Sequence, residues 1–348
     1  MNQQRIILSD KFELIKKQLE AKKFKWLVTG AAGFIGSHLT KFLLDNNQKV
    51  IALDNFSTGL RSNIDFLEKH FSELNNDSKF TFHNADIRDY DLCFKLTNNI
   101  DYVLHQAAIG SVPRSIEDPL NTHDANINGF INILLASMHN QVKNFIYASS
   151  SSIYGDSEVL PKQEEHTGQP LSPYAVTKSV NETYALVFSK VYGFNSIGLR
   201  YFNVFGQRQY PEGQYAAVIP KWIDAILNDK EVFINGDGST TRDFCYIDNA
   251  IQANILAAMT ENKEALSQIY NIAANYQMSL NELYNIIQKS ISKLKPELIN
   301  NEPIYRDFRP GDIMHSRADI GKAEKLLGYK ATKSVKQGLE ELIELECE

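Results

Sequence analysis

The chain has 348 residues, enough for two domain-sized units of about 150 residues each. Its 36 basic and 42 acidic side chains give a formal net charge of −6, which argues against a nucleic-acid-binding protein, because such proteins carry a basic face. Hydrophobic residues make up 43% of the chain and no apolar run approaches 18 residues, so we expect a globular protein with a large core and no membrane span.

The N-terminal region predicts a helical arm over residues 1–23. Asp10 would cap a short helix whose apolar positions Phe12, Ile15 and Leu19 recur at helical spacing. The arm lacks the long apolar region and small-residue cleavage site of a signal peptide, which favours a cytoplasmic protein. The chain's cysteines are too few and too scattered for a disulfide framework or a zinc site, and its histidines show no ligand spacing, so we expect no metal site.

From Phe24 onward, short β-rich apolar runs alternate with amphipathic helical patterns. The runs are residues 25–29, 49–53, 80–83, 102–105, 145–148 and 196–199. Runs of this length separated by helical patterns indicate βαβ units and a parallel sheet covered on both faces. Residues 24–200 are therefore predicted to form an α/β domain with a doubly wound parallel sheet.

After Tyr201 the alternation becomes less regular. Short strand candidates at 232–234, 244–246 and 269–272 are mixed with helical patterns at 217–227 and 280–291. We interpret residues 201–348 as a smaller α/β C-terminal lobe that shares segments with the first domain.

A glycine motif follows the first predicted strand directly and precedes a helical pattern. In this GxxGxxG motif, Gly30 permits a tight turn, Gly33 lets the backbone approach a pyrophosphate, and Gly36 lets the helix pack close to the strand. Asp54 ends the second strand, where its carboxylate can accept hydrogen bonds from ribose hydroxyls and would repel a 2′-phosphate. The pattern predicts binding of NAD rather than NADP, and the alternative is a structural glycine turn with an incidental Asp.

Tyr174 and Lys178 lie four residues apart in a predicted helix and therefore share one helix face. A lysine ammonium beside a phenol stabilises the phenolate and lowers its pKa, which makes the tyrosine a candidate base. This spacing is common on helices and is weak evidence by itself. A serine run, 149–152, follows the fifth strand, at the edge of an α/β sheet where ligands bind. A serine there can share a proton with the tyrosine, and the alternative is a polar loop or a helix cap.

Together, GxxGxxG, Asp54, the segment His105-Gln106-Ala107-Ala108, the serine run and YxxxK resemble the extended short-chain dehydrogenase/reductase superfamily. The sequence is especially similar to one branch of its nucleotide-sugar epimerases, the UDP-N-acetylglucosamine 4-epimerases, over residues 25–329. The most similar segments are LDNFSTG (53–59), LHQAAIGSVPRSIEDP (104–119), LSPYAVTK (171–178), LRYFNVFGQRQ (199–209), INGDGSTTRDFCYIDN (234–249) and YRDFRPGDIMHSRADI (305–320).

The resemblance implies a Rossmann fold and a role for individual residues. The catalytic group would be Ser150, Tyr174 and Lys178. The NAD-binding residues would be Gly30, Gly33, Phe34, Ile35, Gly36, Asp54, Asn55, Ser57, Gly59, Asp86, Ile87, Gln106, Ala107, Ala108, Tyr174 and Lys178. The residues that bind the UDP-sugar would be Gly110, Ser111, Ser150, Tyr174, Asn203, Tyr215, Arg242, Arg309, Asp312 and Ser316.

Ser316 bears on the choice of sugar. Related epimerases restricted to non-acetylated sugars carry a tyrosine at the matching position, so a serine leaves room for an N-acetyl group at C2. The alternative is that Ser316 caps the helical pattern that starts at Ala318.

The serine run separates this chain from other branches of the superfamily. Dehydratases of the superfamily place Asp-Glu where this chain has Ser151 and Ser152, decarboxylases keep a Glu there, and the epimerase-reductases of GDP-fucose synthesis place a Cys in the run. The resemblance therefore implies simple 4-epimerisation of UDP-N-acetylglucosamine with bound NAD, for surface polysaccharide synthesis.

Two alternatives stay open: 4-epimerisation of the uronic acid form or of UDP-glucose, and a non-catalytic module that binds NAD or a nucleotide sugar. A homodimer through helices near 119–138 and 174–192 is also implied.

Overall fold

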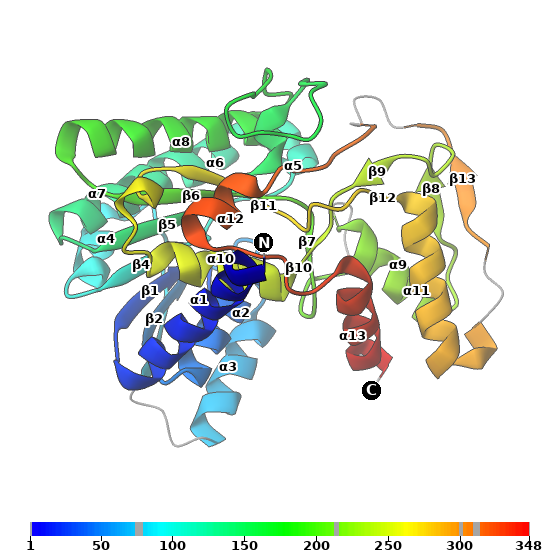
Figure 1. Cartoon of the computed structure of the whole chain (residues 1–348), viewed down its shortest axis with the longest axis horizontal. Coiled ribbons are helices and arrows are strands. Elements are labelled where there is room, and N and C mark those ends of the chain that lie inside the picture. The colour runs from blue at the N-terminus through cyan, green and yellow to red at the C-terminus, as the bar shows by residue number, and fades with distance from the viewer. Residues whose placement is uncertain (1, 74–78, 212–215, 299–301, 309–313, 348) are drawn as a thin grey trace.

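The computed structural model describes residues 2–73, 79–211, 216–298, 302–308 and 314–347. Its centre is a seven-stranded sheet in which every neighbouring pair is parallel, with the strand order β11-β6-β5-β4-β1-β2-β3 (Figure 1). The strands are β1 (Lys25–Thr29), β2 (Lys49–Asp54), β3 (Phe80–Asn84), β4 (Tyr102–His105), β5 (Asn144–Ser150), β6 (Ser196–Tyr201) and β11 (Ile269–Ile272). This order confirms the predicted doubly wound α/β fold.

Helices cover both faces of this sheet. On one face lie α2 (Phe34–Asp45), α3 (Arg61–Glu73) and α10 (Ile247–Ala258), and on the other α4 (Tyr90–Thr97), α7 (Gly129–His139) and α8 (Pro173–Tyr192). Successive strand residues point to opposite faces, so Trp26 and Val28 pack in the first core and Leu27 in the second.

The six runs predicted as strands all lie in this sheet, but the sheet has one strand more. The run 269–272, expected among the irregular strands after Tyr201, pairs with β6 as β11, with Ile269 opposite Gly198. Parallel pairing needs a long crossover, and the almost wholly buried α10 supplies it. A crossover between segments that lie far apart in sequence leaves no local sequence pattern, which is why β11 was not assigned to the sheet.

The N-terminal arm is helical, but its start differs from the prediction. Helix α1 (Asn2–Ala21) begins before Asp10, so Asp10 lies inside the helix and does not cap it. The stretch before Asp10 contains neither glycine nor proline, and an internal Asp disfavours a helix only mildly. Ile15 and Leu19 of α1 are buried in the core that also contains residues of α2 and α10.

Elements of the C-terminal half form a second group beside the sheet (Figure 1). Helix α12 (Gly321–Leu327), also from this half, packs against β11 and α10 at the sheet. The helices of the second group are α9 (Val218–Leu227), α11 (Leu280–Leu294) and α13 (Val335–Cys347). Three short pairs of strands accompany them: β7 (Val204–Phe205) with β10 (Cys245–Tyr246), β8 (Phe233–Asn235) with β13 (Ile304–Arg306), and β9 (Thr241–Arg242) with β12 (Met278–Ser279). Within the described ranges, no helix is both long and apolar enough to cross a membrane.

Two short helices lead from the sheet to α7. They are α5 (Val112–Glu117) and α6 (Pro119–His123), and a π-helical turn (Asp124–Asn128) joins α6 to α7. Within that turn, the Asn126 amide bonds both the N–H and the carbonyl of Ile109 and the Thr177 hydroxyl, so this connection is fixed between the loop after β4 and α8.

Candidate active site

A cavity of about 500 Å³ opens at the carboxyl ends of the central strands, where the strand order reverses between β1 and β4. Open α/β sheets bind ligands in this crevice. The cavity is lined by every residue predicted to bind NAD except Gly59: Gly30, Gly33, Phe34, Ile35, Gly36, Asp54, Asn55, Ser57, Asp86, Ile87, Gln106, Ala107, Ala108, Tyr174 and Lys178. A Cβ on Gly59 would lie 2.7 Å from the Cβ of Ala32, so this glycine lets the loop after β2 pack closely.

The glycine motif forms a compact turn between β1 and α2. Gly30 has φ +69°, a conformation that suits glycine, and a Cβ on Gly36 would lie only 2.0 Å from the Gly30 carbonyl oxygen. Gly33 is the residue just before α2, so bare backbone and the helix N-terminus face the cavity together. This arrangement suits a pyrophosphate, because the first amides of a helix are unpaired and carry partial positive charge.

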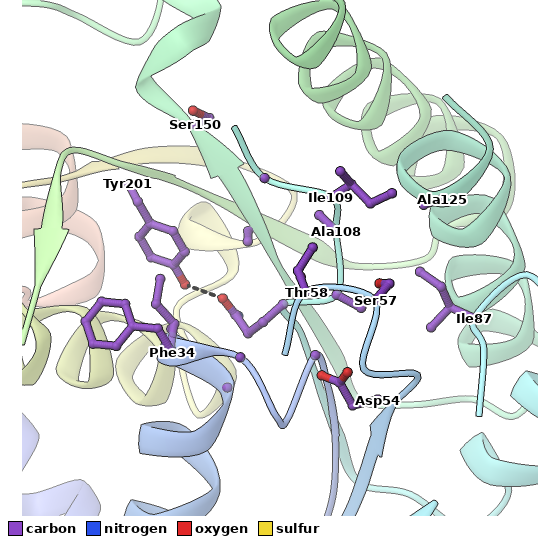
Figure 2. A pocket seen from close by; sticks show the side chains of 18 of the residues that line it. Phe34, Asp54, Ser57, Thr58, Ile87, Ala108, Ile109, Ala125, Ser150 and Tyr201 are labelled. Carbon is purple, nitrogen blue, oxygen red and sulfur yellow. Dashed lines mark hydrogen bonds between the residues drawn. The ribbon is translucent and has the colours of Figure 1, made fainter. Parts of the chain in front are cut away.

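Two carboxylates mark one end of the cavity. Asp54 is 7% exposed, accepts the N–H groups of Ala32 at 3.0 Å and Phe56 at 2.8 Å, and has its pKa raised by burial. Figure 2 shows it below Ser57 at the edge of the cavity. Asp86, which follows β3, accepts a hydrogen bond from Arg88 at 2.7 Å, and this contact lowers the pKa of Asp86 to about 2. Both acids are therefore placed to accept hydrogen bonds from the nucleoside end of a dinucleotide.

A closed triangle of hydrogen bonds supports the cavity behind Gln106. The Tyr201 hydroxyl donates to Gln106 Oε1 at 3.1 Å, the bond drawn as a dashed line in Figure 2. Asn254 Nδ2 donates to the Tyr201 oxygen at 2.7 Å, and Gln106 Nε2 donates to Asn254 Oδ1 at 3.2 Å. Tyr201 lines the cavity, although the sequence analysis did not assign it to the site. Its position at the end of β6, next to Asn203, is the signal that would have identified it.

Helix α8 carries Tyr174 and Lys178 into the cavity. Its N-terminus is fixed by Ser172, whose hydroxyl accepts the N–H of Ala175 at 3.1 Å. Lys178 Nζ lies 5.8 Å from the centre of the Tyr174 ring and donates to the Ala148 carbonyl at 2.8 Å. The helix thus brings the phenol and the ammonium together as the spacing predicted.

Ser150 joins this pair from the end of β5. Burial raises the pKa of the Tyr174 phenol, and the hydrogen bond from Ser150 lowers it. Burial lowers the pKa of Lys178 to about 8, while the Glu182 carboxylate raises it. Ser150 also accepts the N–H of Ser152 at 3.1 Å and so caps a short 3₁₀ turn, which means that the functional and the capping interpretations of this serine are compatible.

A second cavity of about 390 Å³ adjoins the first on the side of the C-terminal elements. The two share Asn203, Val204 and Gln209, and the second is also lined by Arg242. Trp222, Phe233 and Arg306, which the sequence analysis did not single out, line it as well. The two cavities therefore meet at these shared residues.

The residues predicted to bind the UDP-sugar divide into three groups. Gly110, Ser150 and Tyr174 line the first cavity, Arg242 lines the second, and Asn203 lines both. Ser111 and Ser316 line neither cavity. Tyr215, Arg309 and Asp312 lie outside the described residues.

Ser316 and Ser111 have defined local roles. The Ser316 N–H donates to the Thr241 carbonyl at 3.2 Å, one residue before Arg242. It does not cap a helix, since α12 begins at Gly321, so the capping interpretation is wrong. The chain from Ala318 to Ile320 is instead held by a bridge to Lys162 and by contacts of Asp319, which delays the helix. The Ser111 hydroxyl caps α5.

The acidic residues that line the two cavities come from other elements than α8, which carries Tyr174. Among the described lining residues they are Asp54 and Asp86, next to the ends of β2 and β3 in the first cavity, and Glu231 in the second. Ser151 lines the cavity beside Ser150 where a dehydratase has an acid. The described part of the chain also contains no group of three or more His, Cys, Asp or Glu that could hold a metal ion.

Comparisons with known proteins agree with this geometry. Residues 26–273 match the model of the NAD dependent epimerase/dehydratase family. A protein of Methanocaldococcus jannaschii assigned as a UDP-glucose 4-epimerase is 39% identical over 319 residues, which are 91% of this chain and 96% of its own. The UDP-N-acetylglucosamine 4-epimerase of Methanobrevibacter ruminantium, solved with UDP-N-acetylmuramic acid, is 37% identical with a TM-score of 0.83, over 93% of this chain and 98% of its own. The UDP-glucuronic acid 4-epimerase of Bacillus cereus, solved with UDP-glucuronic acid and NAD, is 35% identical with a TM-score of 0.80, over 92% and 98%. The chain therefore belongs to the NAD-dependent epimerase/dehydratase family.

Proposed function

We propose that this protein interconverts UDP-N-acetylglucosamine and UDP-N-acetylgalactosamine by inverting C4 of the hexose, with NAD bound throughout. The family and its relatives make the chain an NAD-dependent UDP-sugar 4-epimerase. The observation that carries the reaction type is the group around Tyr174: a phenol, an ammonium and a hydroxyl, with the acids of the described lining elsewhere. This group can move one proton, but it offers no carboxylic acid to expel water from the sugar.

The residues of the first cavity fit NAD. The turn at Gly30, Gly33 and Gly36 leaves no room for side chains where a pyrophosphate would approach the start of α2, and Asp54 and Asp86 stand where ribose and adenine would lie. Bound NAD supplies a hydride acceptor, and later a hydride donor, at C4 of the sugar. The protein itself performs the proton transfer and holds the substrate.

Tyr174 is the proposed base and acid. As a phenolate, stabilised by the Lys178 ammonium and the Ser150 hydroxyl, it takes the proton of the C4 hydroxyl and later returns it to the C4 oxygen, when the ketone is reduced on its opposite face. In between, the 4-keto sugar must turn over while UDP stays bound. The second cavity, with Arg242, is the proposed anchor, because a guanidinium pairs well with diphosphate oxygens and its binding energy serves the chemical step remotely.

Three observations support an acetylated, uncharged hexose. The M. ruminantium relative acts on UDP-N-acetylglucosamine. Position 316 carries a small side chain. Lys178 is the one cation among the described residues that line the first cavity, so the C6 carboxylate of a uronic acid would have no partner there apart from the catalytic ammonium. The uronic form and UDP-glucose are the competing substrates.

The test is turnover by the purified protein on UDP-N-acetylglucosamine, UDP-glucose and the uronic forms of both. We expect the highest kcat/KM on UDP-N-acetylglucosamine, and NAD in the supernatant after denaturation. Higher kcat/KM on another sugar would overturn the substrate, and bound NAD without turnover of any UDP-sugar would favour the non-catalytic module.

We also propose a homodimer in which α8 meets its copy. The face of α8 opposite Tyr174 carries a stripe of exposed apolar side chains, which we call the α8 stripe: Val176, Tyr184, Val187 and Val191. Nearby, Leu120 of α6 is 82% exposed. An apolar surface of this kind is typical of a protein interface.

The resemblance further implies a cytoplasmic enzyme that serves surface polysaccharide synthesis. The cytoplasmic location and the role in polysaccharide synthesis are part of the proposal.

A further inference from the structure

The catalytic face of α8 carries a third ionisable residue. Tyr174, Lys178 and Glu182 follow one another at intervals of four, so they line one side of the helix. Glu182 is 6% exposed and lies one turn beyond Lys178, behind the cavity wall. This carboxylate takes no part in the proposed proton transfer.

Glu182 is fixed by contacts from two strands. Arg200 of β6 donates from Nε to Oε1 at 2.9 Å and from Nη2 to Oε2 at 2.8 Å, a two-pronged contact. The Ser149 hydroxyl of β5 donates to Oε1 at 2.6 Å. Arg200 in turn is held by the Tyr154 hydroxyl and the Glu164 carbonyl, each at 3.0 Å. The carboxylate therefore has one well-defined position.

A buried ion pair is weak evidence for a stabilising role. Removing two charges from water costs several kcal/mol per ion, and well-packed apolar residues often replace such a pair without loss of stability. The position of this pair points to another role, because the neighbouring Lys178 is also buried and its Nζ donates to a neutral carbonyl, that of Ala148. A buried ammonium beside neutral groups tends to lose its proton.

Glu182 is the only negatively charged group among the described neighbours of Lys178 named here, which are taken in turn from each element packed against it. From β4, His105 has its pKa lowered to about 3 by burial and by the Lys178 charge, so it is neutral. From β5 comes the Ala148 carbonyl, and the next residues of that strand are the neutral Ser149 and Ser150, which line the same cavity. From β6 comes Arg200, whose charge is turned toward Glu182. On α8 itself the neighbours are the Tyr174 phenol and Glu182.

We propose that Glu182, oriented by Arg200, is a positioning residue of the epimerase: its buried negative charge keeps the Lys178 ammonium protonated beside Tyr174. The inference rests on the proposed roles of Tyr174 and Lys178. A carboxylate one helical turn beyond Lys178 acts without touching the substrate, and the two hydrogen bonds from Arg200 hold it in place.

The test measures the protonation of Lys178 directly, without substrate. Protein containing ¹⁵N-lysine and its bound NAD is titrated by NMR, and the Lys178 Nζ signal is identified by its loss in Lys178→Arg. All variants are made in a Tyr174→Phe background, so that the phenol does not titrate together with the lysine. Because no sugar is present, the result does not depend on which UDP-sugar is the substrate.

Four variants separate charge from scaffolding. Glu182→Gln removes the charge and keeps the shape. The double variant Glu182→Gln/Arg200→Met removes both charges of the ion pair and leaves no unpaired arginine. It replaces Glu182→Gln in the titration if that single variant does not fold. Glu182→Asp retains the charge, and Arg200→Lys retains both charges but loses the two-pronged contact.

We expect the titration midpoint of Lys178 to fall by about one pH unit or more in both variants that lack the carboxylate. It should stay near the parental value in Glu182→Asp and Arg200→Lys. In enzyme with Tyr174 intact, the alkaline limb of the kcat–pH profile should move in the same direction. An unchanged midpoint in the variants without the carboxylate would overturn the inference. An equal fall in Arg200→Lys would do so too, because the effect would then be one of scaffolding.

Discussion

Tyr174 is held at two points that do not depend on each other. Its backbone N–H donates to the Ser115 hydroxyl of α5 at 3.0 Å, and its phenol is bonded by Ser150. The ring therefore has an anchor even when the phenol oxygen is removed. Because the backbone contact positions Tyr174 independently of its hydroxyl, removing that hydroxyl tests its chemical role without displacing the residue.

Tyr174→Phe should leave folding and NAD content close to those of the parent, because one hydroxyl is lost and the backbone anchor remains. The kcat should fall by about 10²–10⁴-fold, the usual effect of removing a general acid–base group. Steady-state kinetics with a measurement of bound nicotinamide checks both points, and a near-normal kcat would remove Tyr174 from the role of base.

Ser150→Ala and Ser149→Ala form a matched pair of adjacent serines. Ser150 bonds the Tyr174 phenol, whereas Ser149 donates to the buried Glu182. We expect Ser150→Ala to lower kcat far more than Ser149→Ala, yet less than Tyr174→Phe. Equal kcat values for the two alanine variants would contradict the assignment of Ser150.

Ser316→Tyr tests the sugar pocket. The serine is half-buried beside Thr241, next to Arg242 of the second cavity, and caps no helix. If it borders the C2 substituent, the added ring should abolish turnover of UDP-N-acetylglucosamine while UDP-glucose is still converted. Ser316→Ala is the control, with both rates near the parental values. Equal losses on both sugars, or an unchanged preference, would remove Ser316 from the pocket.

At the scale of elements, α8 has two functional faces. One carries Tyr174, Lys178 and Glu182 against the sheet, and the other exposes the α8 stripe. The proposed subunit contact and the proposed catalytic residues therefore lie on opposite sides of one helix. A change on the exposed side can therefore be made without touching the chemistry.

Val187→Asp should convert the proposed dimer to a monomer. The valine is 45% exposed in the middle of the α8 stripe, so the charge costs little in the monomer but would be buried twice at a twofold contact. Leu14→Asp is the matched control, since Leu14 is 56% exposed on α1 and lies away from α8. Sedimentation velocity measures the masses, and a parent that is itself monomeric would rule out the dimer.

The sequence predicts best what is local. The glycine turn and the pair Tyr174–Lys178 follow from spacings within one strand–turn–helix unit or one helix, and all of these residues line the same cavity. The triangle of Gln106, Tyr201 and Asn254 was not predicted, because its members are far apart in the chain. The same holds for the pairing of β11 with β6 and for the ion pair of Glu182 with Arg200, since periodicity does not specify contacts between distant segments.

At the scale of the whole molecule, the fold joins two half-sites. The sheet presents the glycine turn, the acids and the catalytic group, and the C-terminal elements present Arg242, Trp222 and their neighbours. Asn203, at the end of β6, lines both cavities. In the proposed mechanism, a nucleotide anchored on one side and a dinucleotide on the other would leave the hexose between them, as a reaction with a turning intermediate requires.

The most direct test of this account follows the hydrogen at C4. Purified protein, with no added nicotinamide, is incubated with UDP-N-acetylglucosamine carrying deuterium at C4, and the product is examined by NMR and mass spectrometry. A hydride that leaves C4 and returns within one closed site predicts UDP-N-acetylgalactosamine with deuterium retained at C4. Product carrying solvent hydrogen at C4, or turnover that requires added cofactor in stoichiometric amount, would contradict the account.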